Sequence, residues 1–262
     1  MPAGKVFLTG AGPGDPGLLT VRAREVLREA DVLLYDALAS DAIVALAPRA
    51  CARIFCGKRG GGESVAQAEI QALMIANARE GKRVVRLKGG DPFLFGRGGE
   101  EAQALHAAGI DFEIVPGISS AIAAPAYAGI PVTHRDHNTV VTIVAGHEDP
   151  EKAVSAIDWK RLSDPKQTLI FLMAMSNLGE IAARLMQNGL PGSQPAAVVA
   201  NATRPGQRTV TGTLESIAAD AGQANIAAPA IVIIGTVVRL REQIAWFEKS
   251  ALFGKRVLVT RP

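Results

Sequence analysis

The chain has 262 residues, 48% of them hydrophobic and 20% charged, with a formal net charge of +3 at pH 7. A chain of this length and composition can bury a sizeable core, which excludes an intrinsically disordered protein. The basic residues are scattered, with few aromatic residues among them, so the sequence argues against a nucleic-acid groove while allowing a small acidic substrate.

The start of the chain resembles a first strand rather than an export signal. It enters the β-rich run 6–10 almost at once, whereas a signal peptide needs a basic start, a longer apolar stretch and a cleavage site. No apolar run approaches the length of a membrane span. Cys51 and Cys56 form neither a CxxC motif nor a disulfide framework, which favours buried structural thiols. We therefore expect a cytoplasmic protein without membrane contact.

Short β-rich runs alternate with helical patterns through the first half of the chain, which predicts βαβ units and a mostly parallel sheet. The expected strands are 6–10, 32–35, 53–56, 84–88 and 112–115. The expected helices are 21–29 and 65–80, capped by Thr20 and Ser64, together with 41–47 and 100–108. The pattern breaks near 129–132, so we place a first α/β domain at residues 1–133.

The second half repeats the alternation less regularly. Expected strands are 139–145, 168–173, 196–200, 207–212 and 230–234, and expected helices are 176–188, 214–221 and 238–247. The third and fourth of these strands flank NATRPG and predict a hairpin, so this sheet should be mixed. We assign a second α/β domain to 138–248 and a tail to 249–262. Two α/β domains with a short linker predict a cleft between them, where ligand sites commonly form.

Glycines and ionisable residues gather where the expected strands of the first domain end. These positions are GAGPGDPG at 10–17, Tyr35-Asp36, Gly57-Lys58-Arg59, Lys88-Gly89-Gly90-Asp91 and PGISSA at 116–121. Ligands of open parallel sheets bind outside the carboxyl ends of the strands. This edge of the sheet is therefore the predicted site.

Three familiar motifs are incomplete. A dinucleotide fingerprint that begins at Gly10 would need its third glycine where Asp15 stands. Neither Lys58 nor Lys88 follows the glycine spacing of a phosphate-binding Walker loop. The run HRDH at 134–137 lacks the downstream Asn of a kinase loop, and no second ligand cluster completes a metal shell, so we expect no metal.

Six motifs follow one another in an order that a known family shares: VFLTGAGPGDPGLLT, YDAL, GKRGG, RVVRLKGGDPFLFGRGGEE, VPGISSA and GIPVTHRD. From about Val6 to Phe247 the chain resembles the uroporphyrinogen-III C-methyltransferases, which are tetrapyrrole methylases. The resemblance implies two α/β domains with a non-Rossmann S-adenosylmethionine site, and methylation of uroporphyrinogen III at carbons C2 and C7. The products would be S-adenosyl-L-homocysteine and precorrin-2, at the branch to siroheme and cobalamin.

The resemblance also implies which residues bind the cofactor. They are Pro13, Gly89, Gly90, Asp91, Leu94, Ser119, Ser120, Met173 and Ala202. Relatives often have Thr-Ala where Ser119-Ser120 stands, and some have Gly in place of Ala202, but these are mainly backbone contacts. We expect the cofactor to lie against Gly89 and Gly90, where no Cβ obstructs it, with Asp91 accepting hydrogen bonds from it. The alternative is a turn in which Asp91 only caps the next segment.

The acetate and propionate arms of uroporphyrinogen III require cationic partners. By the same resemblance Arg97, Glu100 and Arg135 face this substrate, and guanidinium groups suit bidentate carboxylate binding. Arg97 is also cast as a catalytic base in this family, but a guanidinium is a poor base, so we expect it to position charge. Asp36 and Lys58 are carried over as proton acceptor and donor. Their alternatives are a capping carboxylate and a solvated lysine.

Other functions stay open. A sibling methylase would act on a later corrin precursor. A non-catalytic tetrapyrrole- or nucleotide-binding module would keep the glycines but would not need Asp36, Lys58 and Arg97, and a nicotinamide oxidoreductase is disfavoured by the incomplete fingerprint. We expect a small-molecule tetrapyrrole as ligand and a homodimer as assembly.

The tail carries a β-rich run of its own, LFGKRVLVTRP at 252–262. It resembles the opening of uroporphyrinogen-III synthase, so fusion or association with that synthase is one hypothesis. An extra strand that pairs with an edge of the second domain is the other.

Overall fold

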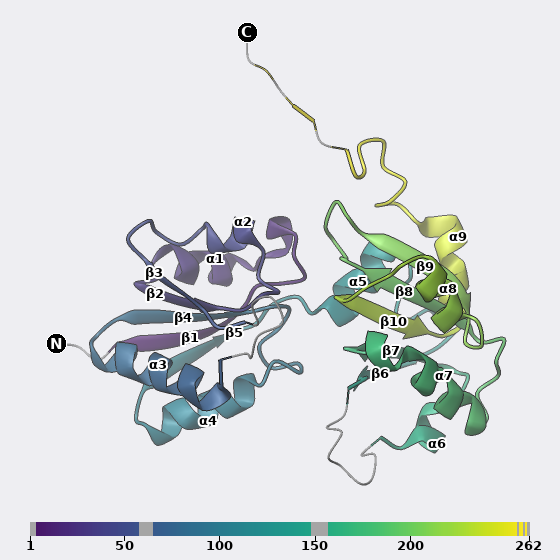
Figure 1. The fold of residues 1–262 in the computed structure, drawn as a ribbon, viewed down its shortest axis with the longest axis horizontal. Helices are drawn as coiled ribbons and strands as arrows, with labels where there is room; N and C mark the ends of the chain where they lie inside the picture. The colour runs from purple at the N-terminus through teal and green to yellow at the C-terminus, as the bar shows by residue number, and fades with distance from the viewer. Residues whose placement is uncertain (1–3, 58–64, 148–156, 256, 259, 261–262) are drawn as a thin grey trace. The chain divides into compact units, whose positions relative to one another are not determined.

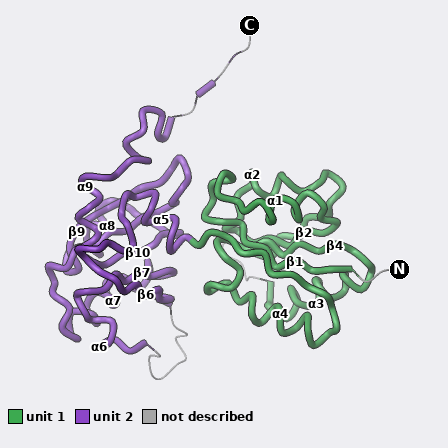
Figure 2. Tube along the Cα trace, turned by 180° about the vertical axis from the view of Figure 1, so that it is seen from behind, with its two compact units in different colours: residues 1–119 green, residues 120–262 purple. Residues whose placement is uncertain are grey.

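The computed structural model describes residues 4–57, 65–147, 157–255, 257–258 and 260. The chain divides into two compact units, Met1–Ser119 and Ser120–Pro262 (Figure 2). Each unit combines one sheet with helices, so the two predicted α/β parts are confirmed. The division falls before α5 (Ser120–Ala128), earlier than the expected limit at residue 133, because α5 packs on β7, β8 and β10 of the second unit.

The first unit contains a parallel sheet in the order β3-β2-β4-β1-β5, as the alternation of strands and helices predicts. Helices α1 and α2 cover one face of this sheet, and α3 and α4 cover the other (Figure 1). The elements are β1 (Lys5–Gly10), η1 (Pro16–Leu18), α1 (Val21–Arg28), β2 (Val32–Tyr35), α2 (Asp41–Val44), β3 (Ala52–Phe55), α3 (Gln67–Arg79), β4 (Arg83–Lys88), α4 (Gly98–Ala107) and β5 (Asp111–Val115).

Strand β4 separates two cores because successive side chains of a strand point to opposite faces of the sheet. Val85 and Leu87 pack with the residues of α1 and α2, whereas Val84 packs with those of α3. Arg86 and Lys88 follow Val84 on the second face, and both are buried. Buried cations require charged or polar partners, which the helices on this face supply.

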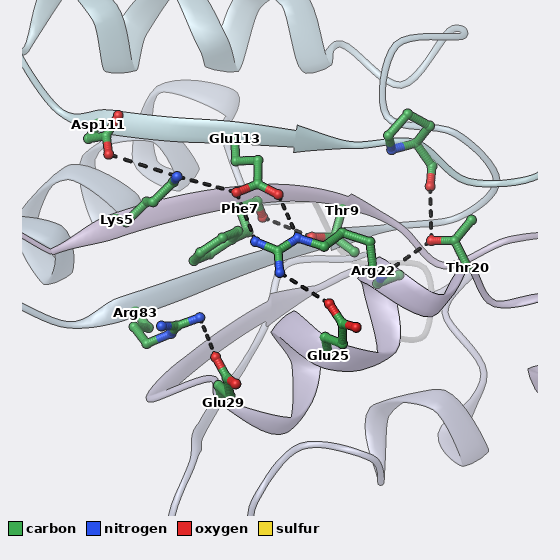
Figure 3. A network of polar contacts seen from close by, with 12 residues as sticks. Lys5, Phe7, Thr9, Thr20, Arg22, Glu25, Glu29, Arg83, Asp111 and Glu113 are labelled. Atoms are coloured by element: carbon green, nitrogen blue, oxygen red, sulfur yellow. Dashed lines mark hydrogen bonds and ion pairs between the residues drawn. The ribbon is translucent and has the colours of Figure 1, made fainter.

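A polar network around Glu113 ties α1, β1 and β5 together (Figure 3). The guanidinium of Arg22 donates to both carboxylate oxygens of Glu113, at 2.7 and 3.0 Å, and Lys5 Nζ lies 3.2 Å from the same carboxylate. The hydrogen bonds from Arg22 and then Lys5 lower the pKa of Glu113 to about 2. Thr20 caps α1 by accepting from Ala23 N at 3.2 Å, as predicted. The network therefore fixes the first helix on its sheet.

The second unit contains a mixed sheet in the order β6-β7-β10-β8-β9. Strands β6 and β7 run parallel, and β8 and β9 form the predicted antiparallel hairpin. The elements after α5 are β6 (Val140–Ala145), α6 (Trp159–Leu162), β7 (Gln167–Leu172), η2 (Met175–Asn177), α7 (Leu178–Gln187), β8 (Pro195–Ala200), β9 (Arg208–Thr213), α8 (Ile217–Gln223), β10 (Ala230–Ile234), η3 (Thr236–Leu240) and α9 (Arg241–Ile244).

The structure differs from the sequence expectation at α5, at α6 and at 238–247. Helix α5 was not predicted, because Pro125 and a run of small residues obscure its helical period. The single helix expected at 238–247 is the turn η3 followed by the short α9. In the described part of the tail, where the sequence left an extra strand as one of two alternatives, Phe253 packs on Phe247 at a ring-centroid distance of 5.3 Å. Ser64, an expected cap, lies outside the described residues.

No helix in the part of the chain that the structure describes is long and apolar enough to cross a lipid bilayer.

Candidate functional site

The loops after β1 and β4 are bonded to each other at the carboxyl edge of the first sheet. Ala11 N donates to Lys88 O at 2.7 Å, beyond the last ladder pair. Gly12 and Gly90 then exchange backbone hydrogen bonds of 3.1 and 2.8 Å. Pro13 follows Gly12, which is paired with Gly90. The loop after β1 and the loop after β4 therefore form one surface.

The glycines at this edge pack against the chain itself. A Cβ atom on Gly117 would lie 2.3 Å from Gly90 O, and one on Gly10 would lie 2.6 Å from the Cα of Gly117. A Cβ on Gly89 would lie 2.5 Å from the Cβ of Leu38. Gly90 has a φ of +67°, which also favours glycine. The close approach of the segments that follow β1, β2, β4 and β5 thus accounts for these glycines without a ligand.

Asp91 joins the loop after β4 to the loop after β5. Its Oδ1 accepts from Phe93 N at 2.8 Å, and its Oδ2 accepts from Gly117 N at 3.0 Å. The capping contact that the sequence left as an alternative is therefore present, together with a second bond to a distant loop. Because Ser119 follows Gly117 closely, four of the expected cofactor residues gather on loops bonded to one another: Pro13, Gly90, Asp91 and Ser119.

The segment 89–97 leads from β4 into α4 and carries most of the expected ligand contacts of this unit. Phe95 and Arg97 have left-handed φ values of 53° and 57°, which are unfavourable for such side chains. Phe93 and Phe95 are largely exposed, at 53% and 44%, and Leu94 beside them is half-buried. Strained backbone and exposed aromatic side chains are typical of a ligand-binding loop.

Arg97 and Glu100 form an exposed bidentate ion pair at the start of α4. Arg97 Nε and Nη2 donate to the two carboxylate oxygens of Glu100, at 3.0 and 2.7 Å. The hydrogen bonds raise the pKa of Arg97 and lower the pKa of Glu100. The guanidinium is therefore a permanent cation, which disfavours its use as a base.

Asp36 lies at the end of β2, half-buried, and caps its own turn. Its Oδ1 accepts from Leu38 N at 3.0 Å, and the exposed side chain of Leu38 covers Gly89. The turn after β2 is thereby brought to the loop after β4. Lys58, the expected proton donor, lies outside the described residues.

A buried charge cluster that sequence reasoning missed lies under this edge. Glu101 Oε1 accepts hydrogen bonds from Lys88 Nζ at 2.9 Å, Gln67 Nε2 at 3.0 Å and Arg86 Nε at 3.2 Å. Burial lowers the pKa of Lys88, as does the nearby Arg86, while Glu101 opposes the shift. The available signal was periodic: Arg86 and Lys88 alternate with apolar residues, and Glu101 shares a helix face with the buried Leu105.

The remaining expected residues lie in the second unit. Leu172 of β7 and Val199 of β8 both pair with Ile231 of β10, so Met173 and Ala202 follow strand ends at one edge of that sheet. The backbone there is strained, with φ values of 56° at Met173, 48° at Asn201 and 68° at Thr203.

A glutamine holds the strained loop after β8 in place. Gln207 Oε1 accepts from Thr203 N at 2.9 Å, and its Nε2 donates to Tyr127 O and to Glu248 Oε1. The loop that carries Ala202 is thus anchored to α5 and to the segment after α9.

Two further expected residues, Ser120 and Arg135, lie at the start of helix α5 and after its end. Ser120 is the first residue of α5, and Arg135 is exposed in the turn between His134 and Asn138. The buried Asn138 anchors that turn through bonds of 3.1, 3.1 and 2.7 Å to Val132 O, Val140 O and Thr168 Oγ1. Among the described residues, no group of three His, Cys, Asp or Glu side chains could hold a metal ion.

A family model and individual relatives place the chain in the same family. The model described as Tetrapyrrole (Corrin/Porphyrin) Methylases matches residues 5–218. The chain is 49% identical over 239 residues to the S-adenosyl-L-methionine-dependent uroporphyrinogen III methyltransferase of Methanosarcina barkeri (strain Fusaro / DSM 804), covering 91% of this chain and 94% of that protein.

Two further similarities differ in how much of the other protein they cover. The chain is 49% identical to the siroheme synthase of Pseudomonas putida (strain W619), covering 94% of this chain but 53% of that protein. It therefore spans about half the length of the siroheme synthases it matches. The uroporphyrin-III C-methyl transferase of Thermus thermophilus complexed with S-adenyl homocysteine is 38% identical, with a TM-score of 0.77 and coverage of 90% of this chain and 99% of that one.

Proposed function

Because the chain belongs to the tetrapyrrole methylase family, we propose that it transfers methyl groups from S-adenosylmethionine to carbon atoms of uroporphyrinogen III. The observation that carries the proposal is its similarity, over nearly the full length of both proteins, to the uroporphyrinogen III methyltransferase of Methanosarcina barkeri. A bound S-adenyl homocysteine in the Thermus thermophilus relative supports the same methyl donor.

The loops of the first unit fit this cofactor, because three of them are bonded to one another and carry its expected partners of that unit. When bound, S-adenosylmethionine supplies an electrophilic methyl group on its sulfonium. The chain's own part is to orient it and to exclude water. Residues proposed to hold it are Pro13, Gly89, Gly90, Asp91, Leu94 and Ser119 in the first unit, and Ser120, Met173 and Ala202 in the second.

We assign carboxylate binding on the substrate to Arg97 and Arg135, with Glu100 as the residue that orients Arg97. The bidentate pair fixes the guanidinium plane and keeps it charged, which favours recognition of an acetate or propionate arm. Arg97 then binds and stabilises charge and does not accept a proton. This role agrees with the expectation from its chemistry.

Asp36 is proposed as the acceptor of the proton that a methylated pyrrole ring must lose. Its position at a strand end, half-buried and beside the loop after β4, suits this role. Lys58 remains the proposed donor on the resemblance alone.

We propose C2 and C7 as the methylated positions and precorrin-2 as the product, and a cytoplasmic homodimer as the working form. A sibling activity on a later corrin precursor is the alternative. Association with uroporphyrinogen-III synthase rests only on the tail sequence.

Incubation with S-adenosylmethionine labelled in its methyl group and uroporphyrinogen III tests the proposal directly. We expect two labelled methyl groups per tetrapyrrole, detected by mass spectrometry, and S-adenosyl-L-homocysteine as the second product. Label transfer only to a later corrin precursor would favour the sibling methylase. Binding of both ligands without any transfer would favour a non-catalytic module.

A further inference from the structure

One buried ion pair joins the two ends of the segment 89–97. Lys88 is the residue before this segment, and Glu101 lies in the first turn of α4, just after it. Lys88 Nζ lies 2.9 Å from Glu101 Oε1, and the two side chains are 6% and 0% exposed. The loop that carries Asp91 and Arg97 is therefore closed at its base by a bond that water does not reach.

Charge balance does not require Lys88. Arg86 also donates to Glu101 Oε1, at 3.2 Å, and is 4% exposed. The Arg86 guanidinium already balances the Glu101 carboxylate, so the Lys88 ammonium adds a second positive charge in a buried place, where desolvation is costly. Among the described residues Asp36, an anion at the end of β2, offsets part of this charge. A charge retained at such a cost requires a local reason.

The loop above the pair supplies that reason. Phe95 and Arg97 hold left-handed φ values, and such a backbone persists only where the surrounding structure enforces it. Gly98 N donates to Pro92 O at 3.0 Å, and a Cβ on Gly98 would lie 2.3 Å from the same oxygen, so the loop folds tightly on the start of α4. Its shape depends on the end of β4 and the start of α4 staying together.

We propose that Lys88 is a positioning residue, whose bond to Glu101 closes the segment 89–97 and so fixes Asp91 and Arg97 for ligand binding. Arg86 bonds the same oxygen from two residues deeper in β4, so its bond joins the same two elements but does not adjoin the loop. The part of the inference that concerns ligands rests on the proposed function. The part that concerns loop closure does not.

Lys88→Met and Arg86→Met are a matched pair of variants. Each removes one buried cation from the same carboxylate and leaves the other in place, so the charge change and the burial are alike. Hydrogen exchange of the amides of Phe93, Gly98 and Gly117, which the loop contacts protect, reports on its closure. We expect these amides to exchange at least about tenfold faster in Lys88→Met only, since the charged hydrogen bond lost there adjoins the loop, whereas the one lost in Arg86→Met lies two residues further from it.

A second readout addresses the ligands. Lys88→Met should bind S-adenosyl-L-homocysteine about tenfold more weakly by calorimetry, and Lys88→Arg should recover part of both effects. Equal loosening of the loop in the two methionine variants would overturn the proposal, as would loss of the fold in Lys88→Met alone, because either result assigns Lys88 a general structural role. If the protein methylates no tetrapyrrole, the proposed function fails, while the exchange result still decides on loop closure.

Discussion

Two carboxylates in the first unit have the same kinds of partners and very different surroundings. Glu113 pairs with Arg22 and Lys5, and its side chain is 28% exposed. Glu101 pairs with Arg86 and Lys88, and its side chain is fully buried. Around Glu113 further acids share the cations, since Glu25 bonds Arg22 and Asp111 lies 3.9 Å from Lys5. Around Glu101 the cations are in excess.

The difference separates a partly exposed contact between elements that already pack together from a buried contact that fixes local geometry. Ion pairs reached by water contribute little each, and those at Glu113 join elements that already pack through α1 and β1. A buried cluster with excess charge is a poor stabiliser, yet it holds geometry firmly because no water can replace its partners. The segment 89–97 is attached to the buried cluster around Glu101.

The largest expected effect comes from breaking each cluster at its carboxylate. Glu101→Ala leaves two buried cations without an anion and should reduce the free energy of unfolding by about 3–5 kcal/mol. Glu113→Ala, the matched control, should cost only about 1 kcal/mol, because water solvates the freed cations. Urea unfolding of both variants measures the difference. Equal losses would show that burial does not distinguish the two clusters.

Asp91 is a third carboxylate, and its partners are backbone amides of the site loops rather than cations. Asp91→Ala should lower the affinity for S-adenosyl-L-homocysteine by roughly 10- to 100-fold, in line with about 1.5–3 kcal/mol for a hydrogen bond to a charged group. Calorimetry provides the measurement, and Asp91→Asn, which keeps one oxygen acceptor, is the control. An affinity equal to that of the unchanged protein would remove Asp91 from the cofactor site.

Arg97 and Arg135 extend the comparison to exposed cations, one in each unit, that we propose bind the substrate. Replacing either by Ala should reduce kcat/KM for the tetrapyrrole about tenfold, with little change in cofactor affinity, because one charge-assisted contact to a carboxylate is lost. Raised salt should weaken the unchanged enzyme in the same direction. Steady-state kinetics at two salt concentrations test both points. A variant that lost cofactor affinity but kept its KM for the tetrapyrrole would reverse the assignment.

Much of the first unit could be predicted from the sequence, because its strands are short apolar runs that are followed by glycines or ionisable residues. The predicted edge followed from the common direction of those strands, and the described loops after β1, β4 and β5 are bonded to one another there. Glu100 and Glu101 are adjacent glutamates, so residue type alone could not tell which of them is buried. Only the helix phase, which places Glu101 with Leu105, distinguishes the buried carboxylate from the exposed one.

Other features depend on contacts distant in sequence. The hydrogen bond between Asp91 and Gly117 joins residues on different loops. Met173 and Thr203 adopt a left-handed backbone that their side chains disfavour, so their residue types do not predict it. Helix α5 was hidden by Pro125, which disfavours a helix by itself and is accommodated here by packing on the second sheet. Tertiary contacts decided each case.

The smallest expected effect is a pH dependence at Glu113. Its folded-state pKa of about 2 lies below the value of about 4.3 for an unfolded glutamate. The stability it contributes is therefore present above about pH 4.3 and is lost as the pH falls toward about 2. Glu113→Gln, which carries no charge, should make thermal unfolding less steeply pH-dependent in that window, by an amount below about 1 kcal/mol because the pair is partly exposed. High salt should narrow the gap between the two proteins. If the unchanged protein and Glu113→Gln lost stability in parallel on acidification, the carboxylate of Glu113 would not be the group that titrates with unfolding. The contrast with the buried Glu101 would then rest only on the stability losses of Glu101→Ala and Glu113→Ala.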